Sequence, residues 1–494
     1  MKYFFWSLII INLAISGCAE NKSDKIRVVA ELNIGETQDI KLSNGSIVKL
    51  SLIGIDEVRD SIRNAIRAAY VKISVDGQET TLSFGNYNLP VEIGKVQIDC
   101  PAIKTLSTNA NMNVWGLTKD ASFRLWPKGS PYSHPGSFVY PLKQKWFASK
   151  TQAGNPPNWG NDPAVKSIYY HAGFDIGGSE GINEVVSATD GMVIAAAGEV
   201  HDDYRNVNLR AIQAVEGVYV LDPRGWFIRY SHLDSVDGGI RPGVKVKAGQ
   251  RIGFIGKQGT SGGWVHLHFD IKNTDNLSGN IAFEDAYVYA WEAYVRQYKP
   301  SLIAVARPHR LVWTGQEATF DGTKSRSFAG NIVSYEWIFS DGTKATGPVQ
   351  KKSYKMPGEY SEILKVTDSK GNTDYDFAAV EVADRKNPGL FPYIHASYYP
   401  TFNIKPGDPV HFRVRTFFRG AVVKCNTGEE TWDFGDGSPQ VKVRSEFDPE
   451  NQTGGKYAET IHSFGRPGRY IVKVERSNEC GFRTFTNLYV EVRR

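Results

Sequence analysis

Short runs in which apolar and polar residues alternate, separated by glycine turns, recur along most of this chain. A two-residue period predicts strands with one buried face, and the 48 glycines and 23 prolines are typical of a chain with many tight turns. A chain of 494 residues is also too long for a single hydrophobic core. The sequence therefore predicts a mostly β, multidomain protein.

Changes of pattern divide the chain into six parts. We expect a signal peptide over 1–17, a polar tether over 18–26, a β-rich domain of unknown role over 27–135, a histidine-bearing domain over 136–300, and two further β domains over 301–385 and 389–494. Helical spacing predicts a short helix over 56–69 and another over 280–298. The aromatic stripe of the second helix indicates core packing. The net charge of +5 is too small over this length to indicate a nucleic-acid partner.

The N-terminus has the pattern of an export signal. A positive start precedes an apolar stretch over 3–15 that is short for a transmembrane helix, and Ser16-Gly17-Cys18 follows. This segment resembles the lipobox of bacterial lipoproteins. The resemblance implies that Cys18 is lipidated and anchors the protein to a membrane, the outer membrane in a diderm since Ala19 follows. The alternative is a plain secretory signal, and both place the protein outside the cytoplasm.

Three other cysteines remain. Cys425 and Cys480 lie in one C-terminal domain of an exported chain, so a disulfide between them is plausible. Cys100 lies in an expected strand, and we interpret it as a buried inert thiol. The chain has no C-x-x-C pair, which excludes a zinc site built from cysteines.

The C-terminal part contains a diverged repeat. Trp337–Gly342 reads WIFSDG and Trp432–Gly437 reads WDFGDG, and each is followed by a Pro-Gly turn and an alternating strand. Tryptophan and phenylalanine two residues apart point to one face of a strand and can fill a core. Both copies resemble the polycystic kidney disease (PKD) domain, although Ser340 departs from its usual glycine. The resemblance implies two immunoglobulin-like β-sandwiches that serve as spacers or adhesive modules.

Two histidine motifs point to metal chemistry. His171 and Asp175 form H-x-x-x-D, and on an extended strand positions four apart share one face, so both side chains can approach one ion. His266 and His268 form H-x-H, which a strand also places on one face. Two solvated strand histidines remain the alternative for the second motif. His232 ends an apolar strand between the two motifs.

Together these motifs, over about residues 165–275, resemble the lysostaphin-type zinc endopeptidases, a family of peptidoglycan metallopeptidases. The matching pieces are H-x-G-x-D at 171–175, Y-x-H-L at 230–233, G-x-x-V-x-A-G-Q-x-I-G-x-x-G from Gly243 to Gly256, and H-L-H-F at 266–269. The resemblance implies a small antiparallel β-sheet whose groove holds one Zn²⁺.

Carried over by position, the ligands of this Zn²⁺ are His171, Asp175 and His268. His266 and His232 correspond to two catalytic histidines beside the metal. Two positions depart from the family pattern, because Val265 replaces a proline and Asp270 replaces a glutamate. Residues 199–214 are an expected insert and a candidate wall of the groove. No function is predicted for the other histidines, which are His134, His201, His309, His395, His411 and His462.

Three functions remain open. The enzyme hydrolyses peptide bonds in peptidoglycan stem peptides or cross-bridges, or it cleaves exported or environmental glycine-rich proteins. The third hypothesis is that the chain is a non-catalytic surface scaffold or adhesion protein. The sequence does not predict the bond that is cut or the oligomeric state.

Overall fold

The computed structural model describes residues 26–85, 87–153, 157–158, 168–386, 392–418, 428–446, 454–477 and 483–494. Strands predominate in them, which confirms the mostly β prediction. No helix in these ranges is long and apolar enough to cross a membrane. Cys18, Cys425 and Cys480 lie outside the described residues, as does the segment over 1–17, so the signal peptide, the lipidation and the disulfide stay predictions.

The N-terminal part forms two antiparallel four-stranded sheets around one core. Its elements are β1 Val28–Leu32, β2 Thr37–Lys41, β3 Ile47–Arg59, β4 Ile66–Val75, β5 Gln78–Ser83, β6 Val91–Ile93, β7 Val96–Ile103, α1 Lys104–Ala110 and β8 Ala121–Pro127. The strand orders are β1-β8-β7-β6 and β2-β3-β4-β5. Cys100 is buried in β7 as a free thiol, as expected.

The helix expected over 56–69 is wrong. These residues form the end of β3, a turn and the start of β4, which pair as a hairpin. The Asp60 side chain accepts hydrogen bonds from the backbone N–H groups of Ile62 (2.9 Å) and Arg63 (2.6 Å) and so closes the turn. An aspartate that caps a turn has the same local pattern as a helix N-cap, and only the cross-strand pairing separates the two.

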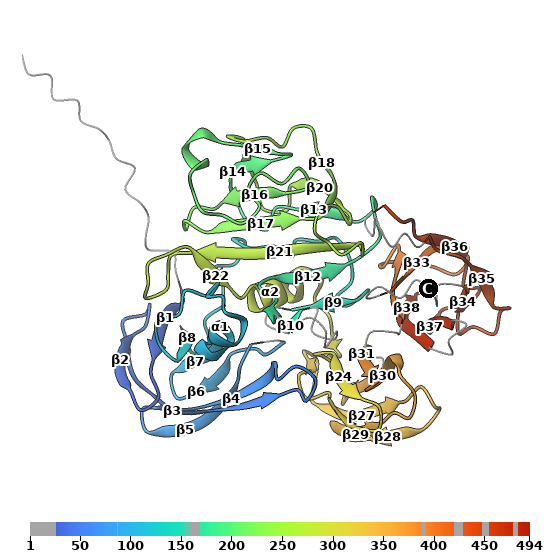
Figure 1. Ribbon diagram of the computed structural model, residues 1–494, viewed down its shortest axis with the longest axis horizontal. Helices are drawn as coiled ribbons and strands as arrows, with labels where there is room; N and C mark the ends of the chain where they lie inside the picture. Colours follow the sequence, from blue (N-terminus) through green and yellow to red (C-terminus); the bar gives the residue numbers. More distant parts are fainter. Residues whose placement is uncertain are drawn as a thin grey trace, which may run out of the picture.

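The central unit of the molecule follows (Figure 1). Its elements are β9 Thr151–Gln152, β10 Pro157–Asn158, β11 Tyr169–Tyr170, β12 Phe174–Gly177, β13 Glu184–Val186, β14 Gly191–Ala196, β15 Glu199–Val200, the 3-10 helix η2 Asp202–Tyr204, β16 Val218–Leu221, β17 Phe227–Ser231, β18 Leu233–Val236, β19 Lys245–Val246, β20 Arg251–Ile255, β21 His266–Asn273, β22 Ala282–Glu284 and α2 Tyr287–Tyr298. A nine-stranded sheet contains the path β15-β14-β16-β17-β21-β12-β9, and a smaller sheet has the order β13-β20-β18. The long strand β21 therefore lies between β17 and β12.

The helix expected over 280–298 is confirmed only from Tyr287 onward. Residues 282–284 instead form β22, which extends the sheet by pairing with β21. The aromatic stripe of α2 packs into the core of the central unit, where Trp146 contacts the rings of Trp291 (5.5 Å between centroids) and Tyr294 (5.2 Å). Its assignment to core packing is therefore confirmed.

A buried ion-pair network joins the N-terminal sheets to the central unit. Arg124 of β8 binds Asp99 of β7 (Nη2–Oδ2 2.6 Å) and Glu284 of β22 (Nη1–Oε1 3.0 Å). Arg27 also binds Glu284, with Nη2 3.1 Å from Oε2. All four side chains are buried, so each charge depends on its partners for the interactions that it loses with water.

Arg124→Ala is expected to destabilise the protein by about 3–5 kcal/mol, because it leaves Asp99 and Glu284 as buried charges without this partner. Urea unfolding followed by tryptophan fluorescence measures the effect. Lys72→Ala is the control, since its pair with Asp56 (3.9 Å) is exposed and is worth at most about 1 kcal/mol. Equal effects of the two substitutions would contradict a role of the network in holding the two parts together.

Two β domains complete the chain. The first contains β23 Leu302–Ile303, β24 Arg310–Trp313, β25 Glu317–Asp321, β26 Arg326–Ser327, β27 Ile332–Ile338, β28 Lys344–Thr346, β29 Val349–Ser353, β30 Gly358–Asp368 and β31 Thr373–Ala383. The second PKD-like domain contains β32 Pro392–Tyr399, β33 Val410–Phe418, β34 Glu430–Asp433, β35 Val441–Val443, β36 Ala458–His462, β37 Gly468–Ser477 and β38 Arg483–Val492. Each has its own core, and the repeated tryptophan and phenylalanine lie in it as predicted (Trp337 with Phe339, Trp432 with Phe434).

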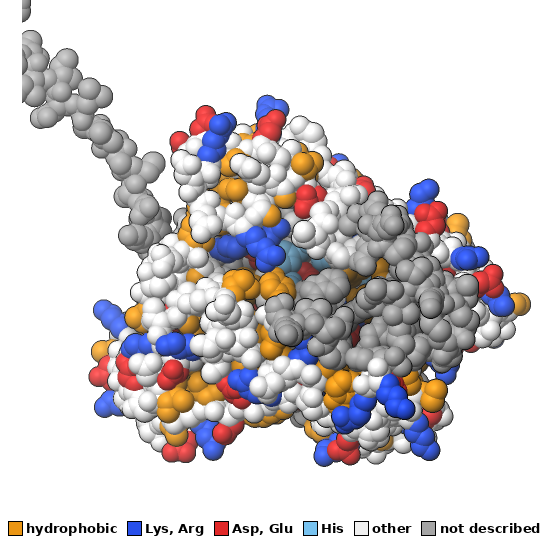
Figure 2. Space-filling view, viewed as in Figure 1, with side chains coloured by type: hydrophobic (Ala, Val, Ile, Leu, Met, Phe, Trp, Pro, Cys, Tyr) orange, Lys and Arg blue, Asp and Glu red, His pale blue; other side chains and the backbone are white. Residues whose placement is uncertain are grey.

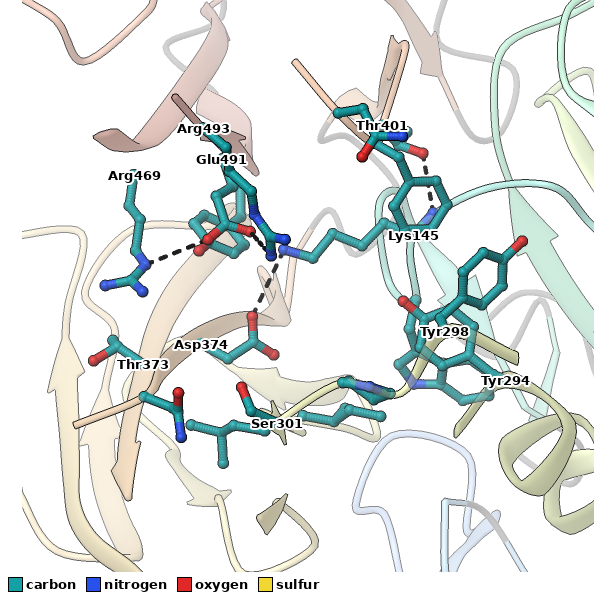
Figure 3. Close-up of a pocket in the computed structure, with 18 residues that line it drawn as sticks. Lys145, Tyr294, Tyr298, Ser301, Thr373, Asp374, Thr401, Arg469, Glu491 and Arg493 are labelled. Carbon is teal, nitrogen blue, oxygen red and sulfur yellow. Dashed lines mark hydrogen bonds and ion pairs between the residues drawn. The ribbon is translucent and has the colours of Figure 1, made fainter. Parts of the chain in front are cut away.

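These two domains and the central unit meet around a cavity of about 470 Å³ (Figure 3). In it, Lys145 points toward Asp374 (Nζ–Oδ1 3.8 Å) and lies 3.7 Å from the centroid of the Tyr489 ring. Tyr298, at the end of α2, stacks on Phe402 with 4.8 Å between ring centroids. The predicted site residues do not line this cavity. Its lining comes from the central unit and from both C-terminal domains, which therefore lie against one another.

Candidate active site

The strand β21 brings the predicted site residues together. His268 on β21 pairs with Asp175 on β12 on one side and with Ser231 on β17 on the other. His266 lies two residues earlier on β21 and therefore on the same face. His171 comes from the segment between β11 and β12, four residues before Asp175 in the chain. Figure 2 shows histidine and acidic side chains at the bottom of a hollow in the surface, beside a group of Lys and Arg side chains.

His171, Asp175 and His268 form a compact triangle of possible metal ligands. His171 Nε2 lies 3.1 Å from His268 Nδ1 and 3.2 Å from Asp175 Oδ1, and these last two atoms are 2.8 Å apart. All three side chains are buried. Burial raises the pKa of Asp175, but the neighbouring His171 and His266 outweigh it and hold this pKa well below its ordinary value.

This triangle fits a metal ion on its own geometry. Ligand atoms about 2.0–2.1 Å from a tetrahedral zinc ion lie about 3.3 Å from one another, close to the three distances above. Two imidazole nitrogens at such a separation repel through their lone pairs unless a cation or a proton lies between them. Two nitrogens and one carboxylate oxygen are also a donor set that zinc accepts, with one position left open for water.

The expected continuous strand through H-x-x-x-D is wrong. The chain leaves β11 after Tyr170 and enters β12 only at Phe174, and β11 pairs with β10 in a separate sheet. Gly173 allows His171 and Asp175 to meet at His268 without a continuous strand, because a Cβ atom at position 173 would lie 2.4 Å from Cε1 of His268. The missing side chain lets the His268 ring pack against this backbone.

Asp270 orients His268 from the side opposite Asp175. Its Oδ2 lies 3.1 Å from His268 Nε2, and it forms ion pairs with Arg229 and Lys272. Burial lowers the pKa of His268, but the hydrogen bonds to Asp175 and Asp270 outweigh it and raise this pKa. A proton therefore competes with a cation for His268 Nδ1, and metal binding weakens as the pH falls. The sequence analysis identifies Asp270 as a replacement of the family's glutamate and does not predict its contact with His268.

Asp270→Asn is expected to weaken metal affinity about 10- to 100-fold, the usual cost of losing a carboxylate that orients a histidine ligand. Competition with a chelator of known affinity measures the change. Asp270→Glu keeps a carboxylate and is expected to retain most of the affinity. Wild-type affinity in the asparagine variant would show that Asp270 does not orient the ligand.

His266 lies beside the triangle, and its Nε2 is available to accept a proton. Its Nδ1 donates a hydrogen bond to the Trp264 carbonyl oxygen (3.0 Å), which leaves a lone pair on Nε2, 3.7 Å from Asp175 Oδ1. The ring stacks on the Trp264 indole with 3.8 Å between centroids. Burial lowers the pKa of His266 to about 4, so the ring is neutral at neutral pH.

His232 has the same arrangement. It lies between β17 and β18, where the chain passes from one sheet to the other with a φ of 65°. Its Nδ1 donates to the Gln258 carbonyl oxygen (2.8 Å), and its ring centroid lies 4.7 Å from that of His266. Burial first, and then the adjacent His266 and His268, hold the pKa of His232 well below its ordinary value. The structure thus brings together all five residues predicted from the motifs.

The insert over 199–214 reaches the edge of this site. Arg210 donates from Nη1 to the Tyr169 hydroxyl (3.0 Å), two residues before His171. His201 has another role, since its Nδ1 accepts a hydrogen bond from the backbone N–H of Asp203 at the start of η2. Tyr170 packs away from the site and accepts a hydrogen bond at its hydroxyl from the Ile66 backbone N–H (2.7 Å).

Comparison with known proteins agrees with this geometry. The profile of Peptidase family M23 matches residues 169–279, which contain all five site residues. The chain contains a peptidase domain of family M23. The M23 domain is followed by a match to the PKD domain over residues 300–382, which is the copy with Ser340.

Similar proteins match parts of the chain. Collagenase ColA of Clostridium perfringens is 35% identical over 83 residues, which are 17% of this chain and 8% of ColA. Pre-pro-metalloprotease PrtV of Vibrio cholerae is 39% identical over 69 residues, 14% of this chain and 7% of PrtV. The chain thus spans less than a tenth of either relative. The solved structure of a putative glycyl-glycine endopeptidase lytM from Ruminococcus gnavus is 24% identical, with 32% of this chain and 61% of that chain covered and a TM-score of 0.23.

Proposed function

We propose that this protein is a zinc-dependent endopeptidase that hydrolyses peptide bonds in peptidoglycan stem peptides or cross-bridges. The observation that supports it most is the triangle of His171, Asp175 and His268 beside two further histidines within an M23 domain. His171 Nε2, Asp175 Oδ1 and His268 Nδ1 would hold the zinc ion. When bound, zinc supplies Lewis-acid activation of a water molecule and of the scissile carbonyl.

His266 and His232 move the proton in this proposal. Each is neutral and has a lone pair on Nε2, because Nδ1 donates to a backbone carbonyl. One of these imidazoles accepts a proton from the attacking water as its oxygen bonds to the carbonyl carbon. It then gives the proton to the amine nitrogen as the C–N bond breaks. The protonated ring also stabilises the negative charge of the tetrahedral intermediate.

The surroundings of the site favour a flexible, anionic peptide. The three ligand residues are buried, so a substrate has to enter the hollow to reach them (Figure 2). The Lys and Arg side chains beside the hollow suit the carboxylates of stem peptides (Figure 2). A second candidate substrate is an exported glycine-rich protein. The similarity to Collagenase ColA and PrtV covers the PKD module and not the peptidase domain, so peptidoglycan remains the first candidate.

Lipidation of Cys18 would hold the enzyme outside the cytoplasm and next to the wall, at the outer membrane in a diderm. Support comes from the apolar stretch that ends in Ser16-Gly17-Cys18. Cells fed a labelled fatty acid are expected to label the wild-type protein and not Cys18→Ala. Label that remains in the variant would exclude the anchor.

The function is tested with soluble protein that starts at residue 19. We expect new muropeptide ends from purified peptidoglycan, their loss with a chelator and their return with added zinc. Cleavage of a glycine-rich protein alone would transfer the assignment to the second candidate. Stoichiometric zinc without cleavage of either substrate would favour a non-catalytic scaffold.

A further inference from the structure

One sheet of the second PKD-like domain is buried on both faces. In β32 and β33 the residues Ile394, Ala396, Tyr398, Val410, Phe412 and Val414 face the core of the domain. The alternate positions face the other way and are polar: His395 pairs with Arg415, and Ser397 pairs with Arg413. In a free sandwich this polar face would meet water, yet His395 and Arg415 are 0% exposed and Ser397 is 1% exposed. The central unit covers it, since Ser149 contacts His395 and Ser179 contacts Ser397, and β33 lies beside this unit in Figure 1.

The second PKD-like domain is hydrogen-bonded to the segment that precedes the H-x-H motif, Gly263-Trp264-Val265. Arg415 donates from Nη1 to the carbonyl oxygen of Gly263 (2.8 Å). The backbone N–H of Val265 donates to the hydroxyl of Tyr457, just before β36 (3.0 Å). Both neighbours of Trp264 are therefore held by side chains of the second PKD-like domain, from about 150 to 190 residues further along the chain.

The hydroxyl of Tyr457 belongs to a chain of hydrogen bonds in which every donor has an acceptor. Tyr457 Oη donates to His395 Nδ1 (2.8 Å), His395 Nε2 donates to Ser149 Oγ (3.0 Å), and Ser149 Oγ donates to the Ala396 carbonyl oxygen (2.7 Å). The Val265 N–H completes this chain at its other end. Such a connected buried network fixes the position of each member more firmly than isolated bonds do.

Trp264, whose two neighbours are held in this way, contacts His266 directly. The indole stacks on the imidazole at an interplanar angle of 16°, and its other neighbour is the His395 ring, 5.3 Å away at 64°. The Trp264 carbonyl oxygen accepts a hydrogen bond from the Nδ1–H group of His266 and so leaves the lone pair on Nε2. Gly177, which pairs with His266 across the sheet, allows the approach, because a Cβ there would lie 2.9 Å from His395 Nε2.

We propose that the second PKD-like domain is an integral part of the active site, in which Arg415 and Tyr457 are positioning residues that orient Trp264 and, through it, the imidazole of His266. This role goes beyond that of a spacer or adhesive module, and it rests on the proposed function of His266. The domain then acts on the catalytic step and not on the attachment of substrate.

Tyr457→Phe and Ser397→Ala form a matched pair for the test. Each removes one hydroxyl from the same interface, but Ser397 contacts Ser179 (2.9 Å) and not the segment before His266. In the full zinc-loaded protein, we expect Tyr457→Phe to lower kcat roughly 10- to 100-fold, as a misplaced catalytic group does. KM should stay within about two-fold, and Ser397→Ala should keep wild-type kcat, because the substrate contacts are unchanged in both variants.

Hydrogen exchange of the peptide over 257–268 gives a readout that needs no substrate. It should be faster in Tyr457→Phe and unchanged in Ser397→Ala, since only the first variant loses the acceptor for the Val265 N–H. Wild-type kcat or wild-type exchange in Tyr457→Phe would overturn the proposal, as would equal losses in both variants. A wild-type protein without peptidase activity would refute the proposed function instead, and the exchange comparison would still decide whether the domain holds this segment.

Discussion

Asp175→Ala is expected to remove both the bound metal and the peptidase activity. The Asp175 carboxylate is the single anionic member of the triangle, and His268 Nδ1 lies 2.8 Å from it. Without it, two neutral nitrogens remain, a donor set with less attraction for a divalent cation. Hydrolysis should fall by at least roughly 10³-fold, more than the loss of one transition-state hydrogen bond usually costs. Elemental analysis and peptidoglycan digestion measure the two effects on the same sample.

Asp203→Ala is the matched control for this variant. It removes an acidic side chain from the insert, 79% exposed and outside the triangle, so both metal content and activity should equal those of the wild type. An Asp175→Ala protein that keeps one zinc per chain would show that the metal is bound elsewhere. Excess zinc that restores activity would show instead that the carboxylate contributes affinity alone.

The H-x-x-x-D and H-x-H spacings indicate side chains that share a face, whereas the roles of the five site residues follow from the resemblance to the lysostaphin-type endopeptidases. His266 and His268 share a face of β21 as a direct result of the strand period. The path between His171 and Asp175 could not be predicted, because it depends on how Gly173 lets the backbone pass the His268 ring. A motif fixes which side chains meet, whereas the backbone that joins them follows from tertiary packing.

The docking of the second PKD-like domain left no local pattern in the sequence. His395 and Arg415 alternate with apolar residues, as in any strand with one solvent-exposed face. The sequence predicts no function for His395. Their burial depends on Ser149, which contacts His395, and on Gly263, which contacts Arg415, and both are distant in the chain. The same limit explains the hairpin at Asp60, where a capped turn and a helix start share one local pattern. Strand pairing decides the hairpin and contacts between domains decide the docking, and neither is recorded in the local pattern of a single sequence.

His266→Gln is expected to separate catalysis from metal binding. Because His266 Nε2 lies outside the triangle, 3.7 Å from Asp175 Oδ1, the variant should keep one zinc per chain with nearly wild-type affinity. Its rate of hydrolysis should fall roughly 10²- to 10⁴-fold, the usual contribution of a general acid–base group. Zinc content and kcat, measured on the same preparation, test both parts.

His201→Gln is the control, because this histidine caps η2 and lies outside the triangle. It should change neither zinc content nor kcat. Loss of zinc in His266→Gln would place His266 among the ligands and would require a different set from His171, Asp175 and His268. Unchanged kcat would leave His232 as the proton carrier, and His232→Gln would then have to show the full loss. A loss in both single variants that is no larger in the double variant would show that the two histidines act as one unit, which the 4.7 Å between their rings leads us to expect.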